Sequence, residues 1–139
     1  MASPYVILWK SHLSVGVADV DEDHKKLIKM INRLFGAALS LEPQRVLEGV
    51  LDELTRYVIF HFEREEEYML RLGYSAYLEH QREHQRLLVA VARFRERLLA
   101  GKVGRLKEEM EATLRDWLVG HILEMDKKMG EFLNSQGIY

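Results

Sequence analysis

The fold of this chain is decided by residues 43–73, which read PQRVLEGVLDELTRYVIFHFEREEEYMLRLG. Apolar side chains recur there at intervals of three or four residues: Leu47, Val50, Leu51, Leu54, Val58, Phe62, Met69 and Leu72. This spacing predicts an amphipathic helix with one buried face. Pro43 favours a helix start and Gly73 a helix end, so we expect one uninterrupted helix between them.

Three further stretches have the same period. The first is expected to begin near residue 20, where Asp19-Val20-Asp21-Glu22 resembles a capping box, and to end near Leu41. The second runs from about Ser75 to Gly101, and the third from about Gly104 to Leu133. Their apolar positions are Val20, Leu27, Ile28, Ile31, Leu34, Phe35 and Ala38, then Tyr77, Leu87, Leu88, Val91, Phe94 and Leu98, and finally Leu106, Met110, Leu114, Trp117, Leu118, Ile122, Met125, Met129 and Leu133.

Four such helices with short connections predict an all-α fold, an up-down-up-down antiparallel four-helix bundle. The residues before the first helix, 1–18, read as an irregular N-terminal segment. A chain of 139 residues fits one domain, so we expect residues 1–139 to form a single unit.

The composition excludes several classes of protein. The net charge is −2 without any basic block, which argues against a nucleic-acid partner. No apolar run approaches the roughly 18 residues that a membrane span needs. The chain has no cysteine, which excludes disulfides, thiolate zinc sites, iron–sulfur clusters and cysteine nucleophiles. We therefore expect a cytoplasmic monomer without membrane insertion.

Five of the six histidines fall on the predicted inner faces of the helices, together with two acids. They are His24, His61, His80, His84, His121, Glu65 and Asp126, whereas His12 lies before the first helix and reads as a surface residue. Burying so many titratable groups costs several kcal/mol, of the order known for unpaired buried charges, unless something pairs them. A bound metal pairs all of them at once, so the pattern predicts a metal site.

The spacing of these residues supports a shared site. His61 and Glu65 are four residues apart, as are His80 and His84, so each pair lies on one helix face. His121 and Asp126 are five apart, a turn of roughly 140° on a regular helix. Either a π-bulge separates these two residues, or Asp126 reaches in from the edge of the buried seam.

The number of donors favours two metals over one. Seven side chains exceed the four of a structural zinc site. Imidazole with carboxylate suits iron, copper, zinc or nickel, and two ions bridged by Glu65 and Asp126 would share the set. The Glu-x-x-His spacing of ferritin-like di-iron proteins does not occur in this sequence.

A known family carries this pattern of residues. The chain resembles the bacterial hemerythrins from about Trp9 to about Phe132, in the segments Val15-Gly16, Asp21-Glu22-Asp23-His24, His61-Phe62-Glu63-Arg64-Glu65-Glu66 with Met69 and Gly73-Tyr74, His80 with His84, and Trp117-Leu118-Val119-Gly120-His121-Ile122 with Asp126. One departure is Asp23, where the family usually has glutamine.

The resemblance implies a di-iron centre with an oxo or hydroxo bridge and with O2 as its ligand. It assigns His80, His84 and His121 to one iron, His24 and His61 to the other, and Glu65 and Asp126 to both. The iron on the His24 and His61 side keeps an open position for O2. An apolar pocket for O2 is expected from Phe62, Trp117, Leu118 and Ile122.

The function that follows is reversible O2 binding, for storage, transport or delivery to an unknown partner, rather than enzymatic turnover. Two alternatives stay open: an O2 or redox sensor, and a di-iron enzyme that handles O2, peroxide or nitric oxide. Glu63, Glu66 and Glu67 flank Glu65 and read as a solvated helix face, although Glu66 could contact a ligand.

Overall fold

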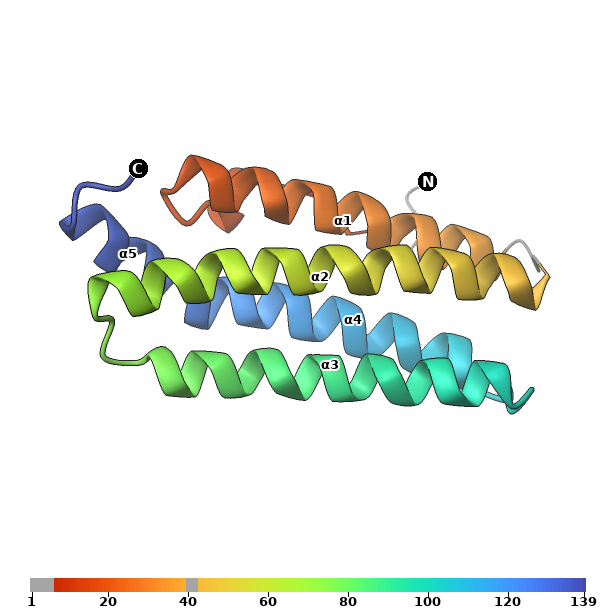
Figure 1. The fold of residues 1–139 in the computed structure, drawn as a ribbon. Helices are drawn as coiled ribbons and strands as arrows, with labels where there is room; N and C mark the ends of the chain where they lie inside the picture. Colours follow the sequence, from red (N-terminus) through yellow and green to blue (C-terminus); the bar gives the residue numbers. More distant parts are fainter. Residues whose placement is uncertain (1–6, 40–42) are drawn as a thin grey trace.

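The computed structural model describes residues 7–39 and 43–139. A short 3₁₀ turn, Ser11–Leu13, precedes helices α1 (Ala18–Leu39), α2 (Gln44–Leu72), α3 (Tyr77–Leu99) and α4 (Leu106–His121), and a π-helical segment, Ile122–Asp126, joins α4 to α5 (Lys127–Ser135). Neighbouring helices run in alternating directions (Figure 1), and α4 with α5 forms the fourth arm. The predicted antiparallel four-helix bundle is confirmed.

Helix α2 begins and ends where its sequence predicts. Pro43 caps its start, and Gly73 at its end adopts φ 72°, a left-handed conformation that glycine accepts without steric cost. The backbone N–H groups of Gly73 and Tyr74 donate to the carbonyls of Leu70 and Met69 at 3.3 and 2.9 Å. These bonds satisfy carbonyls of the last turn that would otherwise lack a partner.

The start of α1 lies within two residues of the predicted position but is not capped as predicted. The helix begins at Ala18, so Asp19 lies inside the first turn, and the expected capping box was wrong. The Asp19 carboxylate instead accepts a hydrogen bond from the Tyr68 hydroxyl at 3.2 Å. Asp21 accepts the backbone N–H of Val15 at 2.8 Å, which ties the preceding segment to this turn.

The other boundaries lie close to those expected. Helices α3 and α4 begin at Tyr77 and Leu106, two residues after the predicted starts. The predicted end of the first helix near Leu41 lies outside the described residues. Helix α2 has 29 residues, but in the described ranges no helix combines such length with enough apolar character to cross a bilayer.

The predicted apolar stripes form the core. Every apolar position predicted for α1 is buried, and those of α2 are buried except Leu72, which is partly exposed. In α3 and the fourth arm the predicted positions are buried or, at Tyr77, Leu88, Trp117 and Met125, partly buried. Each large apolar side chain removed from water contributes about 1.5–3 kcal/mol to folding before entropy is counted.

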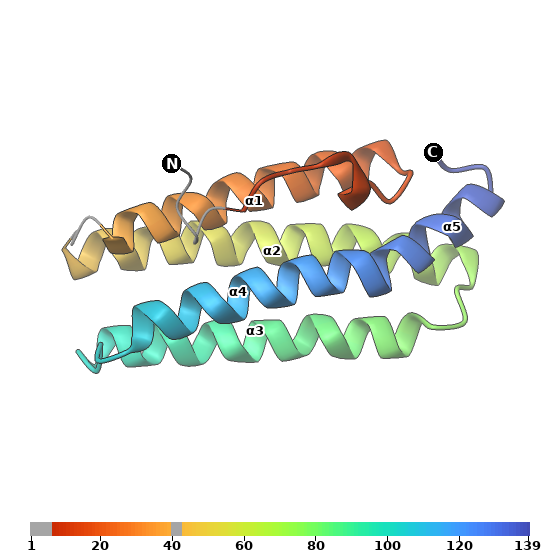
Figure 2. The same ribbon diagram turned by 180° about the vertical axis from the view of Figure 1, so that it is seen from behind.

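The segment before α1 is irregular, as expected, but it also belongs to the core. It runs back along the bundle beside α1 (Figure 2), and its buried side chains are Ile7, Leu13, Val15 and Val17. The side-chain amide of Asn32 pairs with the backbone N–H and carbonyl of Ile7, both at 2.8 Å. At its other end the segment crosses Gly130, where an added Cβ would lie 2.0 Å from the Val15 carbonyl oxygen. Only glycine fits at residue 130 without moving this backbone.

Candidate metal centre

The bundle brings all seven candidate ligands together at one end. His24 comes from α1, His61 and Glu65 from α2, His80 and His84 from α3, His121 from α4, and Asp126 from the end of the π-helical segment. All seven are buried, with His121 the most exposed at 6%. The inward phasing predicted from helical spacing is therefore confirmed, whereas metal binding itself remains a prediction.

The π-helical segment explains the five-residue spacing of His121 and Asp126. Residues Ile122–Asp126 form one wide turn, in which each backbone N–H bonds to the carbonyl five residues earlier instead of four. His121 and Asp126 consequently face the same side, and His121 Nε2 lies 3.0 Å from Asp126 Oδ1. Of the two explanations left open by the sequence, the π-bulge is the one observed.

The donors divide into two groups, and within each group the ligand atoms lie within 4.8 Å of one another. The three-histidine group consists of His80, His84 and His121 with Glu65 and Asp126. The two-histidine group consists of His24 and His61 with the same two carboxylates. Both acids therefore belong to both groups.

The Glu65 carboxylate turns one oxygen toward each group. Its Oε2 lies 3.0 Å from His61 Nε2 and 3.5 Å from His24 Nε2, both in the two-histidine group. Its Oε1 lies 3.0 Å from His84 Nε2 and 3.3 Å from His80 Nε2, both in the three-histidine group.

Asp126 repeats this arrangement from the opposite arm of the bundle. Its Oδ2 lies 3.0 Å from His24 Nε2, and its Oδ1 lies 2.9 Å from His80 Nε2. Two carboxylates that each offer one oxygen to either side are suited to bridge two cations.

Several atoms at the centre lack the partners that burial demands. Within the described residues, His24 Nε2, His84 Nε2 and all four oxygens of Glu65 and Asp126 are buried without a hydrogen bond of acceptable geometry. In addition, the Nε2 atoms of His80 and His121 face each other at 3.1 Å. An unpaired buried polar atom costs about 1–3 kcal/mol, so this set fits a centre that receives cations.

The electrostatics of the cluster likewise call for positive charge. Burial would lower the pKa of His24, but the adjacent Asp126 and Glu65 carboxylates outweigh it and raise the pKa to about 10. The same causes raise the pKa of His80 to about 9. Burial would raise the pKa of Glu65, yet His61, His24 and His80 hold it well below its usual range. The two buried carboxylates thus favour positive charge at the centre, which bound cations would supply.

Two of the histidines are oriented by carboxylates behind them. His61 Nδ1 lies 2.9 Å from Asp23 Oδ2, and His84 Nδ1 lies 2.9 Å from Glu66 Oε2. A carboxylate can only accept, so each Nδ1 carries the proton and each Nε2 is left for the centre. The contact that the sequence left open for Glu66 is thus present, and Asp23, the departure from the family pattern, contacts His61.

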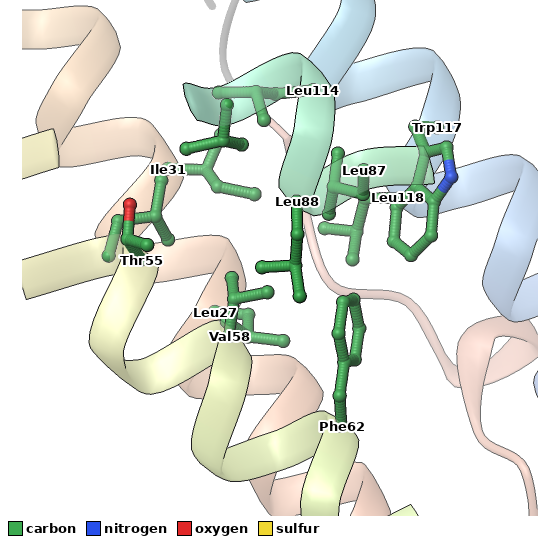
Figure 3. A pocket seen from close by; sticks show the side chains of 12 residues that line it. Leu27, Ile31, Thr55, Val58, Phe62, Leu87, Leu88, Leu114, Trp117 and Leu118 are labelled. Atoms are coloured by element: carbon green, nitrogen blue, oxygen red, sulfur yellow. The ribbon is translucent and has the colours of Figure 1, made fainter. Parts of the chain in front are cut away.

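A small apolar cavity adjoins the cluster and includes three of the four residues expected to form an O2 pocket. Its volume is about 20 Å³, and Phe62, Trp117 and Leu118 line it (Figure 3). The Phe62 ring stacks on His84 and the Trp117 ring on His121, with centroids 3.7 and 4.3 Å apart. The fourth residue, Ile122, is fully buried but is not among the lining residues.

The cavity lies one helical turn from the candidate ligands on all four helices. Its lining includes Leu27, three residues after His24, Val58, three before His61, Leu87, three after His84, and Leu118, three before His121. Thr55 also lines it, but the Thr55 hydroxyl donates to the Leu51 carbonyl at 2.8 Å. The wall nearest the centre is therefore hydrocarbon except for the indole N–H of Trp117, which is buried without a hydrogen-bond partner among the described residues.

The remaining histidine and the flanking acids lie away from the centre. His12 is exposed in the 3₁₀ turn before α1, as predicted. Glu63 and Glu67 are exposed on α2, also as predicted.

Comparison with known proteins assigns the chain to a family. Residues 15–133 match the model of the hemerythrin HHE cation binding domain. The chain belongs to the hemerythrin family. A bacteriohemerythrin of Stenotrophomonas maltophilia is 34% identical over 117 residues, covering 84% of this chain and 74% of that protein. One of Methylococcus capsulatus is 30% identical over 125 residues, covering 90% and 94%. A crystal structure of wild-type hemerythrin superposes with TM-score 0.83 at 30% identity, covering 91% of this chain and 96% of that one.

Proposed function

We propose that this hemerythrin-family chain holds two iron ions at the seven-residue centre and binds O2 reversibly there. One observation carries the proposal: Glu65 and Asp126 are shared between a group of three imidazoles and a group of two. An ion held by His24 and His61 would have one imidazole fewer than an ion held by His80, His84 and His121. It would therefore keep room for an external ligand.

The chemistry of the donor set fits iron. Imidazole and carboxylate together suit a borderline divalent ion, and the two carboxylates offset half the charge of two such ions. A bridging hydroxide would leave about one positive charge, which an apolar bundle can bury at modest cost. Two ferrous ions would supply the electrons that hold O2 and recover them when it leaves.

The protein's own contribution is to exclude water and protons. The cavity one turn from the ligands is lined mainly by aliphatic and aromatic side chains, among them Leu27, Val58 and Leu118. Thr55, a polar residue of the wall, already donates its hydroxyl proton to the Leu51 carbonyl. A wall that is mainly hydrocarbon, with the unpaired indole N–H of Trp117 as its one free donor among the described lining residues, favours release of bound O2 over its reduction, and hence a binding protein over an enzyme.

The physiological part of the proposal is storage, transport or delivery of O2 by a cytoplasmic monomer, with no nucleic-acid partner. These points rest on the sequence pattern and on the family. Sensor and enzyme alternatives use the same centre, so a functional measurement has to separate them.

The test is an O2 cycle followed by visible absorption. The protein is loaded with ferrous iron without oxygen, exposed to O2, and then placed under vacuum. A coloured adduct that forms, disappears and forms again supports the proposal. Immediate irreversible oxidation, or steady consumption of O2 in the presence of a reductant, would overturn it in favour of an enzyme.

A further inference from the structure

The two-histidine side of the centre is backed by a buried carboxylate on α1. We propose that Asp23, held by Tyr57 and Arg64, is a positioning residue that fixes His61 and lowers the reduction potential of the iron pair. This inference rests on the proposed function, since it presupposes iron at the centre. It adds to that function a way in which the chain controls how readily the centre is oxidised.

Asp23 is surrounded by donors on both of its oxygens. Its Oδ2 lies 2.9 Å from His61 Nδ1 and 3.4 Å from Arg64 Nε. Its Oδ1 accepts the Tyr57 hydroxyl at 3.0 Å. Only 4% of Asp23 is exposed. The carboxylate is therefore a fixed charge whose contacts are made by protein groups.

The position of Asp23 in the chain makes this contact possible. Asp23 immediately precedes His24, so the same turn of α1 sends His24 into the centre and Asp23 behind His61 on α2. One element thus supplies a ligand of the two-histidine group and the partner of that group's other histidine.

A charged acceptor changes His61 as a ligand. A carboxylate that accepts the Nδ1 proton draws it away from the ring, which makes Nε2 a stronger electron donor to a metal. Such a donor stabilises ferric iron more than ferrous iron. Because the pair is buried, the effect is only weakly screened by solvent.

On the three-histidine side, the Nδ1 atoms of the histidines have different partners. Glu66, behind His84, has 18% of its side chain exposed and also accepts from Gln81 at 3.1 Å. One histidine on each side, His80 here and His24 on the two-histidine side, has a buried Nδ1 without a hydrogen-bond partner in the part of the chain that the structure describes. The two carboxylate–histidine contacts are equally long at 2.9 Å, but the more deeply buried one lies on the side with the fewer ligands.

Tyr57 moderates the same contact. Its hydroxyl withdraws charge from Asp23 Oδ1, so its removal leaves more negative charge for His61. Loss of the Asp23 charge and loss of the Tyr57 hydroxyl should therefore shift the reduction potential in opposite directions. A purely structural role for either residue predicts no such opposition.

The experiment measures the midpoint potential of the iron-loaded protein by spectroelectrochemistry, with iron per chain determined on the same samples. Asp23→Asn keeps an acceptor oxygen and removes the charge. We expect its potential to rise by about 59 mV, a tenfold weaker preference for ferric iron in a one-electron step. Tyr57→Phe should give a smaller shift in the opposite direction. Glu63→Gln removes an exposed charge two residues from His61 and should leave the potential unchanged.

The inference would be overturned if the potentials of Asp23→Asn and Tyr57→Phe both equal the wild-type value, or if both shift in the same direction. If Asp23→Asn fails to retain two irons, Tyr57→Phe decides, because a negative shift supports the inference and no shift overturns it. The outcome is separable from the O2 proposal. Opposite shifts in a protein that forms no reversible adduct would refute only O2 binding, and unchanged potentials in a reversible binder would refute only the role of Asp23.

Discussion

The two halves of the centre share their carboxylates and differ in the number of their imidazoles and in the side chains packed behind them. The three-histidine half draws its imidazoles from α3 and α4, and two of its rings, His84 and His121, are covered by the aromatic rings of Phe62 and Trp117. The two-histidine half draws on α1 and α2 and is backed by Asp23. The comparison indicates that a four-helix bundle forms two unequal groups of donors when one helix pair supplies one imidazole fewer.

The largest effect is expected from removing a shared carboxylate. Glu65→Ala takes one oxygen from each half, so both ions should be lost and iron should fall from about two per chain toward none. Metal analysis after anaerobic loading measures this. Glu67→Ala, an exposed neighbour on α2, serves as the control and should keep both ions. Retention of both ions by Glu65→Ala would show that Glu65 is not shared.

Two variants that each remove one histidine distinguish the two halves of the centre. His61→Ala leaves the two-histidine half with one imidazole, so about one iron per chain should remain and the O2 adduct should disappear. His84→Ala leaves two imidazoles in the other half and should lose iron less readily. The measurement is the loss of iron to a chelator, followed by the O2 cycle. Equal loss of both ions from His61→Ala would contradict the assignment of the open position.

A smaller effect is expected from the backbone crossing that supports the two-histidine half. Gly130→Ala forces a Cβ onto the Val15 carbonyl, and Val15 in turn bonds Asp21 in the first turn of α1. Overpacking of this kind lowers the free energy of unfolding by about 1–3 kcal/mol. Each kcal/mol lowers the melting temperature of a domain of this size by roughly 3 °C. Thermal unfolding measures the loss, and iron should leave the His24 side first.

Gly49→Ala is the matched control for this change. Gly49 is exposed in the interior of α2 and its added Cβ meets no atom within 4 Å of it in the described structure. The alanine should stabilise the helix by about 0.5–1 kcal/mol. Similar melting temperatures for the two variants would refute the role of the crossing.

The smallest effect is expected in the cavity. Val58→Thr places a hydroxyl one turn before His61, whereas Val91→Thr places the same group two turns beyond His84. A hydroxyl beside the open position supplies a proton donor and favours entry of water, so we expect the O2 adduct to decay several-fold faster. Stopped-flow absorption compares the decay rates. A greater effect of Val91→Thr would place O2 away from the two-histidine half.

Much of this architecture follows from the sequence because helical periodicity is a local signal. The stripes of α1 and α2, the phasing of His61 with Glu65, and the awkward five-residue spacing of His121 and Asp126 are all visible in the printed residues. That last irregularity leaves only a π-bulge or an edge position for Asp126, and the wide turn at Ile122–Asp126 is the π-bulge.

The parts that could not be predicted depend on contacts between distant segments. Tyr57 and Asp23 are 34 residues apart in the sequence, and no spacing rule predicts the hydrogen bond between them. The crossing of Val15 over Gly130 has no periodic signature, because an irregular segment packs by its backbone. The capping box expected at the start of α1 was wrong because Asp19 and Asp21 bond to Tyr68 and Val15 instead of capping the helix.

The central claim is that one buried cluster holds two iron ions in unequal halves. Mössbauer spectroscopy of the anaerobically loaded ferrous protein tests it most directly, since each distinct iron environment gives its own doublet. The account predicts two iron ions per chain and two doublets of equal area. A single iron per chain, or two ions with one shared signal that O2 leaves unchanged, would contradict it.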